Sequence, residues 1–269
     1  MPSTPEKWKS VADGFQTRWN FPNCLGAIDG KHIDITAPAG SGSYYYNYKG
    51  NYSVVLLAIC DTNSDFTYVD VGRNGRVSDG GVWDISNMNV CIENGNAGLP
   101  PDSMLPGSER KLPYVFVADG AFPLKRHISK PFPHSNQNRS ERIFSYRLAR
   151  ARRMVENAFG ILANRFRVFL TPIHLPLEKV ENIVLACTAL HNYLRRDHVS
   201  TYIQHDGPLE YEDISLRTVA PGRWKHNQQL RGLQRVGGNS TVEGRNVRND
   251  YMEYFNQEGA MDWQDSWTL

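Results

Sequence analysis

The chain has 269 residues, of which 40% are hydrophobic and 22% charged, a composition ordinary for a soluble globular protein large enough to bury a core. No apolar run is long enough to cross a bilayer, and the first residues show no apolar stretch typical of a secretory signal. The cysteines form no CxxC pair, which argues against a zinc ribbon or a dithiol redox motif and favours reduced, buried thiols in an intracellular protein. The four cysteines are Cys24, Cys60, Cys91 and Cys187.

The sequence predicts an α/β fold that begins with three strands. Residues 25–36 form a run that we expect to be interrupted at Asp29-Gly30. Residues 52–60 are continuously apolar, as in a central strand covered on both faces, and residues 66–71 alternate between apolar and polar. The short connections between these strands predict an antiparallel meander.

A helix and a further strand follow. Ser78 is a suitable N-cap for an amphipathic stretch over residues 80–92. After a loop rich in Gly, Pro and Asn over 93–113, an apolar strand ends at Asp119. A loop punctuated by prolines then covers residues 123–140.

The clearest helix is predicted over residues 141–169, where no proline occurs and apolar residues recur at three- and four-residue steps. Glu156 lies one residue off this apolar stripe, about 100° round the helix and at the border of the buried face. Small residues on its side of the helix, such as Ala149, leave room for another element or a substrate backbone. A second helix is predicted over residues 178–195. The stripe of the first helix comprises Leu148, Val155, Phe159, Leu162 and Phe166.

Positive charge is concentrated between Lys125 and Arg167, a segment that contains eleven Lys or Arg and two acidic residues and has a net charge of +9. We interpret this segment as a surface that binds a polyanion, because few acidic residues nearby in the sequence neutralise it. A solvated helix face with its counter-charges elsewhere in the fold is the alternative.

Three acidic residues stand out by their apolar surroundings. Asp29 and Asp119 each end an apolar run directly before a glycine, and Glu156 lies in the arginine-rich helix. Carboxylates beside apolar surface are costly unless a partner neutralises or binds them. If the three converge, their oxygens suit a hard divalent cation, the chemistry of phosphodiester cleavage and transfer. This interpretation requires that they meet and that no lysine fills the space between them.

Other site motifs do not fit. The run from Gly26 to Lys31 superficially resembles a phosphate-binding loop, but it is one residue short between the glycines and has His32 where Ser or Thr must reach the metal. No GxGxxG follows a strand, and no HExxH is present. His191 is interpreted as a hydrogen-bonded packing residue rather than a ligand.

The runs 23–33, 117–123 and 152–160 carry the three acidic residues, and together they resemble the three blocks of the DDE superfamily endonucleases. The resemblance is closest to the PIF/Harbinger transposases and the nucleases derived from them. Residues 75–80 and 190–194 match further landmarks of that family. The similarity covers residues 20–196 in colinear order, and the combination of blocks is specific although each block alone is weak.

The resemblance implies an RNase H-like fold, in which a five-stranded mixed sheet carries helices on both faces. Asp29 would lie on the first strand, Asp119 just after the fourth, and Glu156 on a helix packed against the sheet. It further implies that these three residues are catalytic and ligate a divalent metal, Mg²⁺ or Mn²⁺, with Asp29 as the bridging ligand. The reaction would be two-metal, in-line cleavage of DNA phosphodiester bonds.

The implied organisation has three parts. We expect a short N-terminal lead over residues 1–19, the endonuclease domain over 20–196 and a C-terminal extension over 197–269. The extension is expected to be loose over residues 222–249 and to dock a last short helix near Tyr251.

The implied partner is DNA, and candidates for its phosphate contacts are Arg150, Arg152 and Arg153. For Arg152 and Arg153, ion pairing within the fold is an equally weighted alternative. Family members usually carry an upstream helix-turn-helix-like region, so this chain is either a fragment or leaves DNA targeting to a partner. In the family a Myb-like protein supplies DNA binding and nuclear import, which implies a nuclear location; oligomers stay open. A domesticated DNA- or protein-binding module that keeps the fold without turnover is the second hypothesis.

Overall fold

The computed structural model describes residues 1–197, 202, 210–213, 218–220, 222, 230–233 and 239–267. Its principal strands are β1 (Cys24–Asp34), β2 (Ser53–Cys60), β3 (Phe66–Asn74), β6 (Val115–Val117), β7 (Ile128–Ser129) and β10 (Arg231–Gly232). Two small hairpins are formed by β4 (Ser103–Met104) with β5 (Lys111–Leu112) and by β8 (Tyr211–Asp213) with β9 (Thr218–Ala220). The helices are α1 (Pro5–Trp19), α2 (Asp79–Asp84), α3 (Asn87–Glu93), α4 (Arg139–Arg165), α5 (Leu177–Asp197) and α7 (Val242–Asn256), with 3₁₀ turns η1 (Arg167–Leu170) and η3 (Gln264–Trp267).

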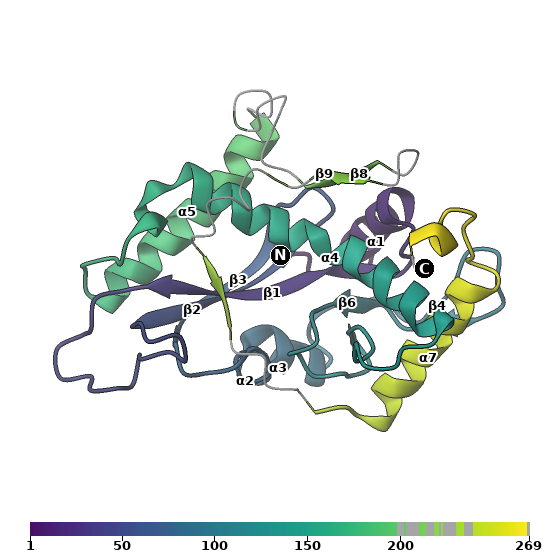
Figure 1. Cartoon of the computed structure of the whole chain (residues 1–269), viewed down its shortest axis with the longest axis horizontal. Coiled ribbons are helices and arrows are strands. Elements are labelled where there is room, and N and C mark those ends of the chain that lie inside the picture. The colour runs from purple at the N-terminus through teal and green to yellow at the C-terminus, as the bar shows by residue number, and fades with distance from the viewer. Residues whose placement is uncertain are drawn as a thin grey trace.

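A mixed sheet forms the centre of the molecule, with strand order β3-β2-β1-β6-β7 and β10 paired to β1 outside that path (Figure 1). The first three strands form the predicted antiparallel meander, whereas β1, β6 and β7 are parallel. Every residue of β2 is buried, which explains its unbroken apolar sequence. The mixed sheet of an RNase H-like fold is therefore present, and within the described residues it has six strands rather than five.

The predicted interruption of the first strand is wrong. β1 continues through Asp29 and Gly30, which lie opposite Ala58 and Leu57 of β2. A buried strand flanked by two neighbours satisfies its backbone groups only if the ladder is continuous, and this outweighs the turn preference of an Asp-Gly pair.

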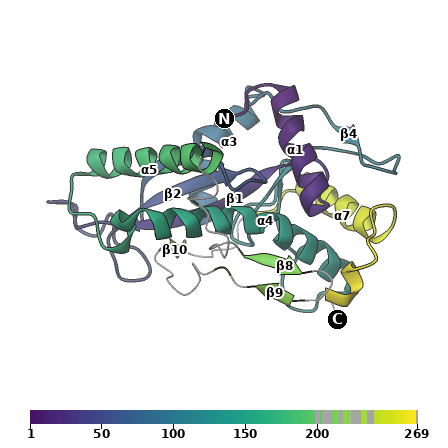
Figure 2. The same cartoon turned by 90° about the horizontal axis from the view of Figure 1, so that it is seen from above.

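Helices cover both faces of the sheet. α4 and α5 lie together on one face, and α2 and α3 lie on the other (Figures 1 and 2). Residues of β1 supply both cores: Ala27 and Ile33 pack with α4, whereas Leu25 and Ile28 pack with α2 and α3. The face that Ala27 shares with the following odd-numbered residues of β1 is the face that carries the candidate site.

α4 is the long helix that the apolar periodicity predicts. Its N-cap is Asn138, whose side chain accepts from the Glu141 backbone N–H while the Glu141 carboxylate accepts from the Asn138 N–H. Its end at Arg165 is earlier than predicted, because Phe166 adopts an extended conformation before a 3₁₀ turn. The predicted stripe packs into the core, where Phe166 is partly buried and the other four members are buried.

The amphipathic stretch predicted over residues 80–92 is two helices rather than one. Ser78 caps α2, as predicted, through a hydrogen bond from the Gly81 N–H. Ser86 then caps α3, accepting from the Asn89 N–H at 3.2 Å. A second capping serine in mid-stretch favours a new helix start over continuation.

The two ends of the described chain pack against α4. Phe21, which follows α1, lies against Tyr251 and Phe255 of α7, so the last helix predicted near Tyr251 is confirmed. The buried Arg147 of α4 donates to the carbonyl oxygens of Asn20 and Gly259. Burial lowers the pKa of Arg147 to about 10. The prediction that residues 222–249 are loose is wrong for residues 242–249, which belong to α7, and residues 223–229 and 234–238 lie outside the described residues.

Two smaller predictions bear on the class of protein. In the part of the chain that the structure describes, no helix is both long enough and apolar enough to cross a membrane. All four cysteines are free thiols, and Cys24, Cys60 and Cys187 are buried.

Candidate active site

Asp29 and Asp119 come from adjacent parallel strands in matching register. Ala27 of β1 lies opposite Val117 of β6, and each aspartate follows two residues later along its strand direction. Because side chains alternate with a period of two, both aspartates face α4 as Ala27 and Val117 do. Neighbouring strands lie about 4.8 Å apart, so the register brings the two backbones close to each other.

Local hydrogen bonds hold both carboxylates. Oδ1 of the buried Asp29 accepts from the Gly30 N–H at 2.9 Å. Oδ1 of Asp119 accepts from the Ala121 N–H at 2.9 Å, which closes the turn after β6. In each case the backbone directly after the aspartate holds one carboxylate oxygen, which is why an Asp followed by small residues suits both positions.

Glu156 reaches the same region from α4. Its carboxylate pairs with Arg152, one turn earlier, at 2.5 Å, and its side chain is 26% exposed. Arg152 is within electrostatic range of all three candidate carboxylates. Burial lowers the pKa of Arg152, but Glu156, Asp29 and Asp119 together more than offset this and raise it. Arg152 therefore lies in the field of all three acids, although its ion pair is with Glu156.

A lysine also belongs to the site. Lys31 is two residues after Asp29 on the same face of β1, and its Nζ lies 2.7 Å from Oδ2 of Asp29. Burial lowers the pKa of Lys31, and the carboxylates of Asp29 and Glu156 more than offset this and raise it. Lys31 was not among the predicted site residues, although its two-residue spacing from Asp29 on a strand is a signal that could have identified it.

The cations bear directly on metal binding. Within the described residues, no group of three His, Cys, Asp or Glu side chains forms a cluster that could hold a metal ion as it stands. The condition that no lysine intrudes is not met, because Lys31 and Arg152 lie among the carboxylates. The donor chemistry still fits Mg²⁺ or Mn²⁺, which prefer carboxylate oxygens, but only if these two side chains move aside. The metal site therefore stays a prediction, and the described residues form no preformed one.

The candidate DNA-contacting arginines are mostly buried in ion pairs. Nε of Arg150 lies 2.5 Å from Glu212, and Nε of Arg153 lies 3.2 Å from Glu210. The side chains of Arg150 and Glu212 are only 4% and 2% exposed. For these two arginines the alternative holds that the counter-charges of the segment lie elsewhere in the fold, because Glu210 and Glu212 are more than fifty positions downstream. For Arg150 and Arg153 the geometry supports a role within the fold.

Other residues of the basic segment are neutralised in the same way. Lys125 pairs with Glu93 at 3.1 Å, and Arg126 pairs with Asp102 at 2.7 Å and with Glu243 at 2.6 Å. These pairs are partly exposed, so each contributes little stability, but together they reduce the field that attracts a polyanion.

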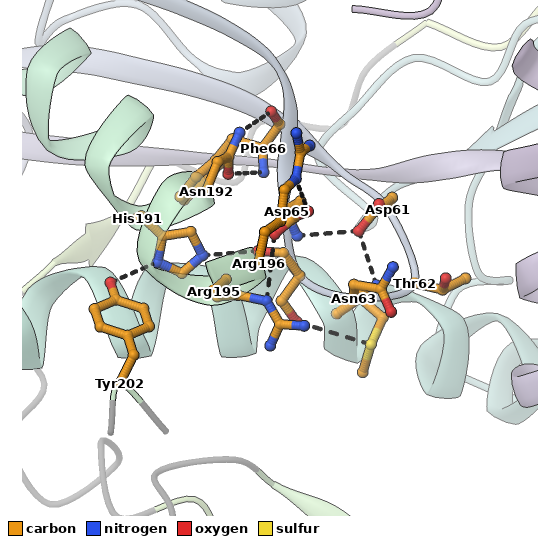
Figure 3. Close-up of polar contacts among 12 residues, drawn as sticks. Asp61, Thr62, Asn63, Asp65, Phe66, His191, Asn192, Arg195, Arg196 and Tyr202 are labelled. Carbon is orange, nitrogen blue, oxygen red and sulfur yellow. Dashed lines mark hydrogen bonds and ion pairs between the residues drawn. The ribbon is translucent and has the colours of Figure 1, made fainter. Parts of the chain in front are cut away.

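His191 is a packing residue, as predicted. Its Nε2 donates to the Ser64 carbonyl oxygen at 2.9 Å, which leaves Nδ1 to accept from the Tyr202 hydroxyl at 2.9 Å (Figure 3). Burial lowers the pKa of His191 to about 4. The adjacent Asn192 exchanges hydrogen bonds of 2.8 Å with the backbone of Phe66, and so α5 is fixed to the start of β3. The family landmark at residues 190–194 serves the fold in this structure.

Asp65 completes this contact. The carboxylate is buried and pairs with Arg195 at 3.3 Å and with Arg196 at 3.0 Å (Figure 3). These pairs attach the turn between β2 and β3 to the end of α5, on the side of the meander away from β6.

Comparison with known proteins agrees with this arrangement. The sequence profile of the DDE superfamily endonucleases matches residues 28–192. The chain is 28% identical to the Arabidopsis thaliana protein ALP1-like over 196 residues, which is 71% of this chain and 48% of the relative. It is 26% identical over 195 residues to HARBI1 of Homo sapiens, a protein named as a candidate nuclease, covering 71% of this chain and 52% of the relative.

A third relative is the Arabidopsis thaliana protein named antagonist of like heterochromatin protein 1, 26% identical over 212 residues, with 76% of this chain and 51% of the relative covered. The chain thus spans about half the length of the curated relatives it matches. No solved structure matches the chain. The family profile covers more than half of the chain and includes all three candidate acids, and the parallel pairing of β1 with β6 brings the backbones of Asp29 and Asp119 close together. The chain therefore belongs to the DDE superfamily endonucleases.

Proposed function

We propose that the chain is a divalent-metal-dependent DNA endonuclease that cleaves phosphodiester bonds, with Asp29, Asp119 and Glu156 as its catalytic metal ligands. The observation that carries the proposal is the parallel register of β1 and β6, which directs Asp29 and Asp119 to one face beneath the helix that bears Glu156. One ligand on a central strand, one directly after the neighbouring strand and one on a packed helix suit a reaction that depends on positioning.

Each residue has a defined task in this scheme. A bound Mg²⁺ or Mn²⁺ would polarise the scissile phosphate and increase the acidity of an attacking water or hydroxyl. Asp29, as the most buried of the three, is suited to the bridging position, and Glu156 remains open enough to orient the nucleophile. Lys31 and Arg152 neutralise the carboxylates in the metal-free protein and prevent their mutual repulsion.

A cleavage assay tests the proposal. Plasmid and linear DNA are incubated with the protein and Mg²⁺ or Mn²⁺, beside the variants Asp119→Asn and Asp265→Asn. Asp265 is 57% exposed and pairs with Arg139 at the start of α4, so its variant controls for loss of one surface carboxylate. We expect cleavage by the wild type and by Asp265→Asn, and none by Asp119→Asn. Equal cleavage by all three proteins, or none by any at high concentration, rejects the proposal.

A non-catalytic binding module is the second candidate. It is favoured by the two cations among the carboxylates and by the absence of a preformed metal cluster in the described residues. Calorimetric titration with Mn²⁺ separates the candidates without an activity readout. An endonuclease is expected to bind the ion and to lose this binding in Asp29→Asn, whereas a module without turnover binds none.

We extend the proposal to nuclear location and to a Myb-like partner that directs the protein to DNA. One Arabidopsis thaliana relative is named for its opposition to a heterochromatin protein, which supports a site of action on chromatin. Fluorescent tagging and co-precipitation with a Myb-like protein encoded in the same genome test these two points. Cytoplasmic retention in the presence of the partner rejects both.

A further inference from the structure

A cavity of about 510 Å³ lies next to Asp119. Its walls come from the turn after β6, the segment after β7, the first half of α4 and one side of α7. Its volume is within the range of about 300–1,000 Å³ that is usual for small-ligand sites. Among the residues that line it are Asp119, Lys130, Phe132, Ala149, Arg152 and Arg248. Since Asp119 and Arg152 belong to both, the cavity is continuous with the candidate active site.

One side of the cavity is cationic. Nζ of the buried Lys130 donates to the carbonyl oxygens of Gly120 at 3.2 Å and Phe122 at 2.7 Å, so its charge is fixed beside the Asp119 turn. The guanidinium of Arg248 lies 3.8 Å from the centre of the Phe132 ring and donates to the Pro131 carbonyl oxygen at 3.4 Å.

Arg248 forms no ion pair in the part of the chain that the structure describes. Glu141 acts on it electrostatically without lying within ion-pair distance, and its buried Nε makes no hydrogen bond. Burial lowers the pKa of Arg248, but an arginine remains charged at neutral pH. A half-buried guanidinium without an anion is costly, and this cost falls when an anion enters the cavity.

The rest of the cavity lining is largely apolar. Phe132 and Leu148 are buried beneath it, whereas Ala149 of α4 is exposed and too small to fill it. Ala149 is one of the small residues that the sequence analysis marked as room for a substrate backbone. The cationic and apolar surfaces adjoin each other where Arg248 contacts Phe132, and with Asp119 at the edge they match a unit made of a phosphate and a flat, weakly polar group.

We infer that this cavity binds one nucleotide of the DNA strand beside the bond that is cleaved. Arg248 contacts the phosphate, and the apolar wall around Phe132 and Ala149 receives the sugar and base. The inference rests on the proposed endonuclease function, because it assigns DNA as the ligand. It predicts that the substrate strand runs from the carboxylates toward the start of α4 and α7.

DNA binding in EDTA tests the inference without catalysis. Fluorescence anisotropy measures the affinity for a labelled duplex with a single-stranded tail between about 50 and 200 mM salt. Arg248→Gln removes the cavity's unpaired charge, and its control is Arg245→Gln, an exposed arginine on the same helix that does not line the cavity. Ala149→Trp fills the cavity without changing charge, and its control is Ala186→Trp, at an exposed alanine of α5.

We expect Arg248→Gln to weaken binding about tenfold and to reduce the slope of log K against log salt by about 0.9, the value for one lost phosphate contact. Ala149→Trp should also weaken binding, whereas both controls bind as the wild type does. Arg248→Lys retains the charge and should retain the slope, and thermal melts identify any variant that fails to fold. Wild-type affinity in Ala149→Trp, or an equal loss in Arg245→Gln and Arg248→Gln, overturns the inference.

The cleavage assay keeps the two proposals distinguishable. Binding that depends on Arg248 and Ala149, without cleavage by the wild type, supports the cavity and rejects the nuclease. Metal-dependent cleavage with a KM unaffected by either substitution supports the nuclease and rejects the cavity.

Discussion

The buried pair between Arg150 and Glu212 gives the sharpest test of what the arginine-rich helix does. Glu212 accepts from Arg150 at 2.5 Å and from the Tyr146 hydroxyl, and it lies 3.7 Å from Arg153. Glu212→Gln removes the charge but keeps the shape of the side chain. Two buried guanidinium groups then lose their nearest shared carboxylate.

The magnitude follows from burial. Breaking one side of a buried ion pair costs about 3–5 kcal/mol, because the remaining charge is uncompensated. In a protein of this size that loss corresponds to a fall of roughly 10 °C in melting temperature. Glu243→Gln is the matched control, because the pair of Glu243 with Arg126 has side chains 57% and 38% exposed. Such a pair contributes less than about 1 kcal/mol.

Urea denaturation followed by circular dichroism measures both variants, and DNA binding provides a second readout. If Arg150 and Arg153 serve folding, Glu212→Gln is destabilised and its DNA affinity does not rise. If they are DNA contacts restrained by Glu212, their release increases the affinity and steepens its salt dependence. A variant as stable as the wild type that binds DNA more tightly would refute the structural role.

Two further predictions concern Lys31 and His191. Lys31→Met removes the countercharge of Asp29, so the free energy of unfolding of the metal-free protein should fall by about 3 kcal/mol. Mg²⁺ should then raise the melting temperature of the variant more than that of the wild type. Equal shifts of the melting temperature by Mg²⁺ would contradict the exchange of lysine for metal. His191 has a pKa of about 4 in the fold, below its ordinary value near 6.5, so the unfolded chain takes up the proton first and stability falls as pH drops from about 6.5 toward 4. Between pH 7.5 and 5.5 this lowers the free energy of unfolding by about 1.4 kcal/mol. Denaturation at both pH values should therefore show a pH dependence of stability that is smaller by that amount in His191→Gln than in the wild type. An unchanged pH dependence would assign the effect to other groups.

Periodicity predicted the elements well where burial alone determines them. The continuous apolar run of β2 and the stripe of α4 each identify their element, because packing against the sheet decides both. The Asp29-Gly30 pair was misleading, since its local turn preference is weaker than pairing with β2. The break between α2 and α3 comes from a second capping serine, Ser86, whose effect the apolar periodicity of residues 80–92 does not show.

The site could be predicted only in part. The family resemblance identified Asp29, Asp119 and Glu156, and the strand register is consistent with their convergence. The counter-ions of Arg150 and Arg153 were harder to predict, because Glu210 and Glu212 reach α4 from a segment whose position no local pattern fixes. Arg248 is more than a hundred residues from Asp119 in the chain, and only the packing of α7 brings it to the same cavity.

The contacts of Arg147 set a lower limit on the folding unit. Its guanidinium is held by Asn20 ahead of β1 and by Gly259 beyond α7, both outside the stretch 28–192 that the family profile covers. Trimming the protein to that shared stretch would leave a charged group inside α4 without its oxygen acceptors. Recombinant versions meant to retain a native catalytic helix should therefore include both flanks.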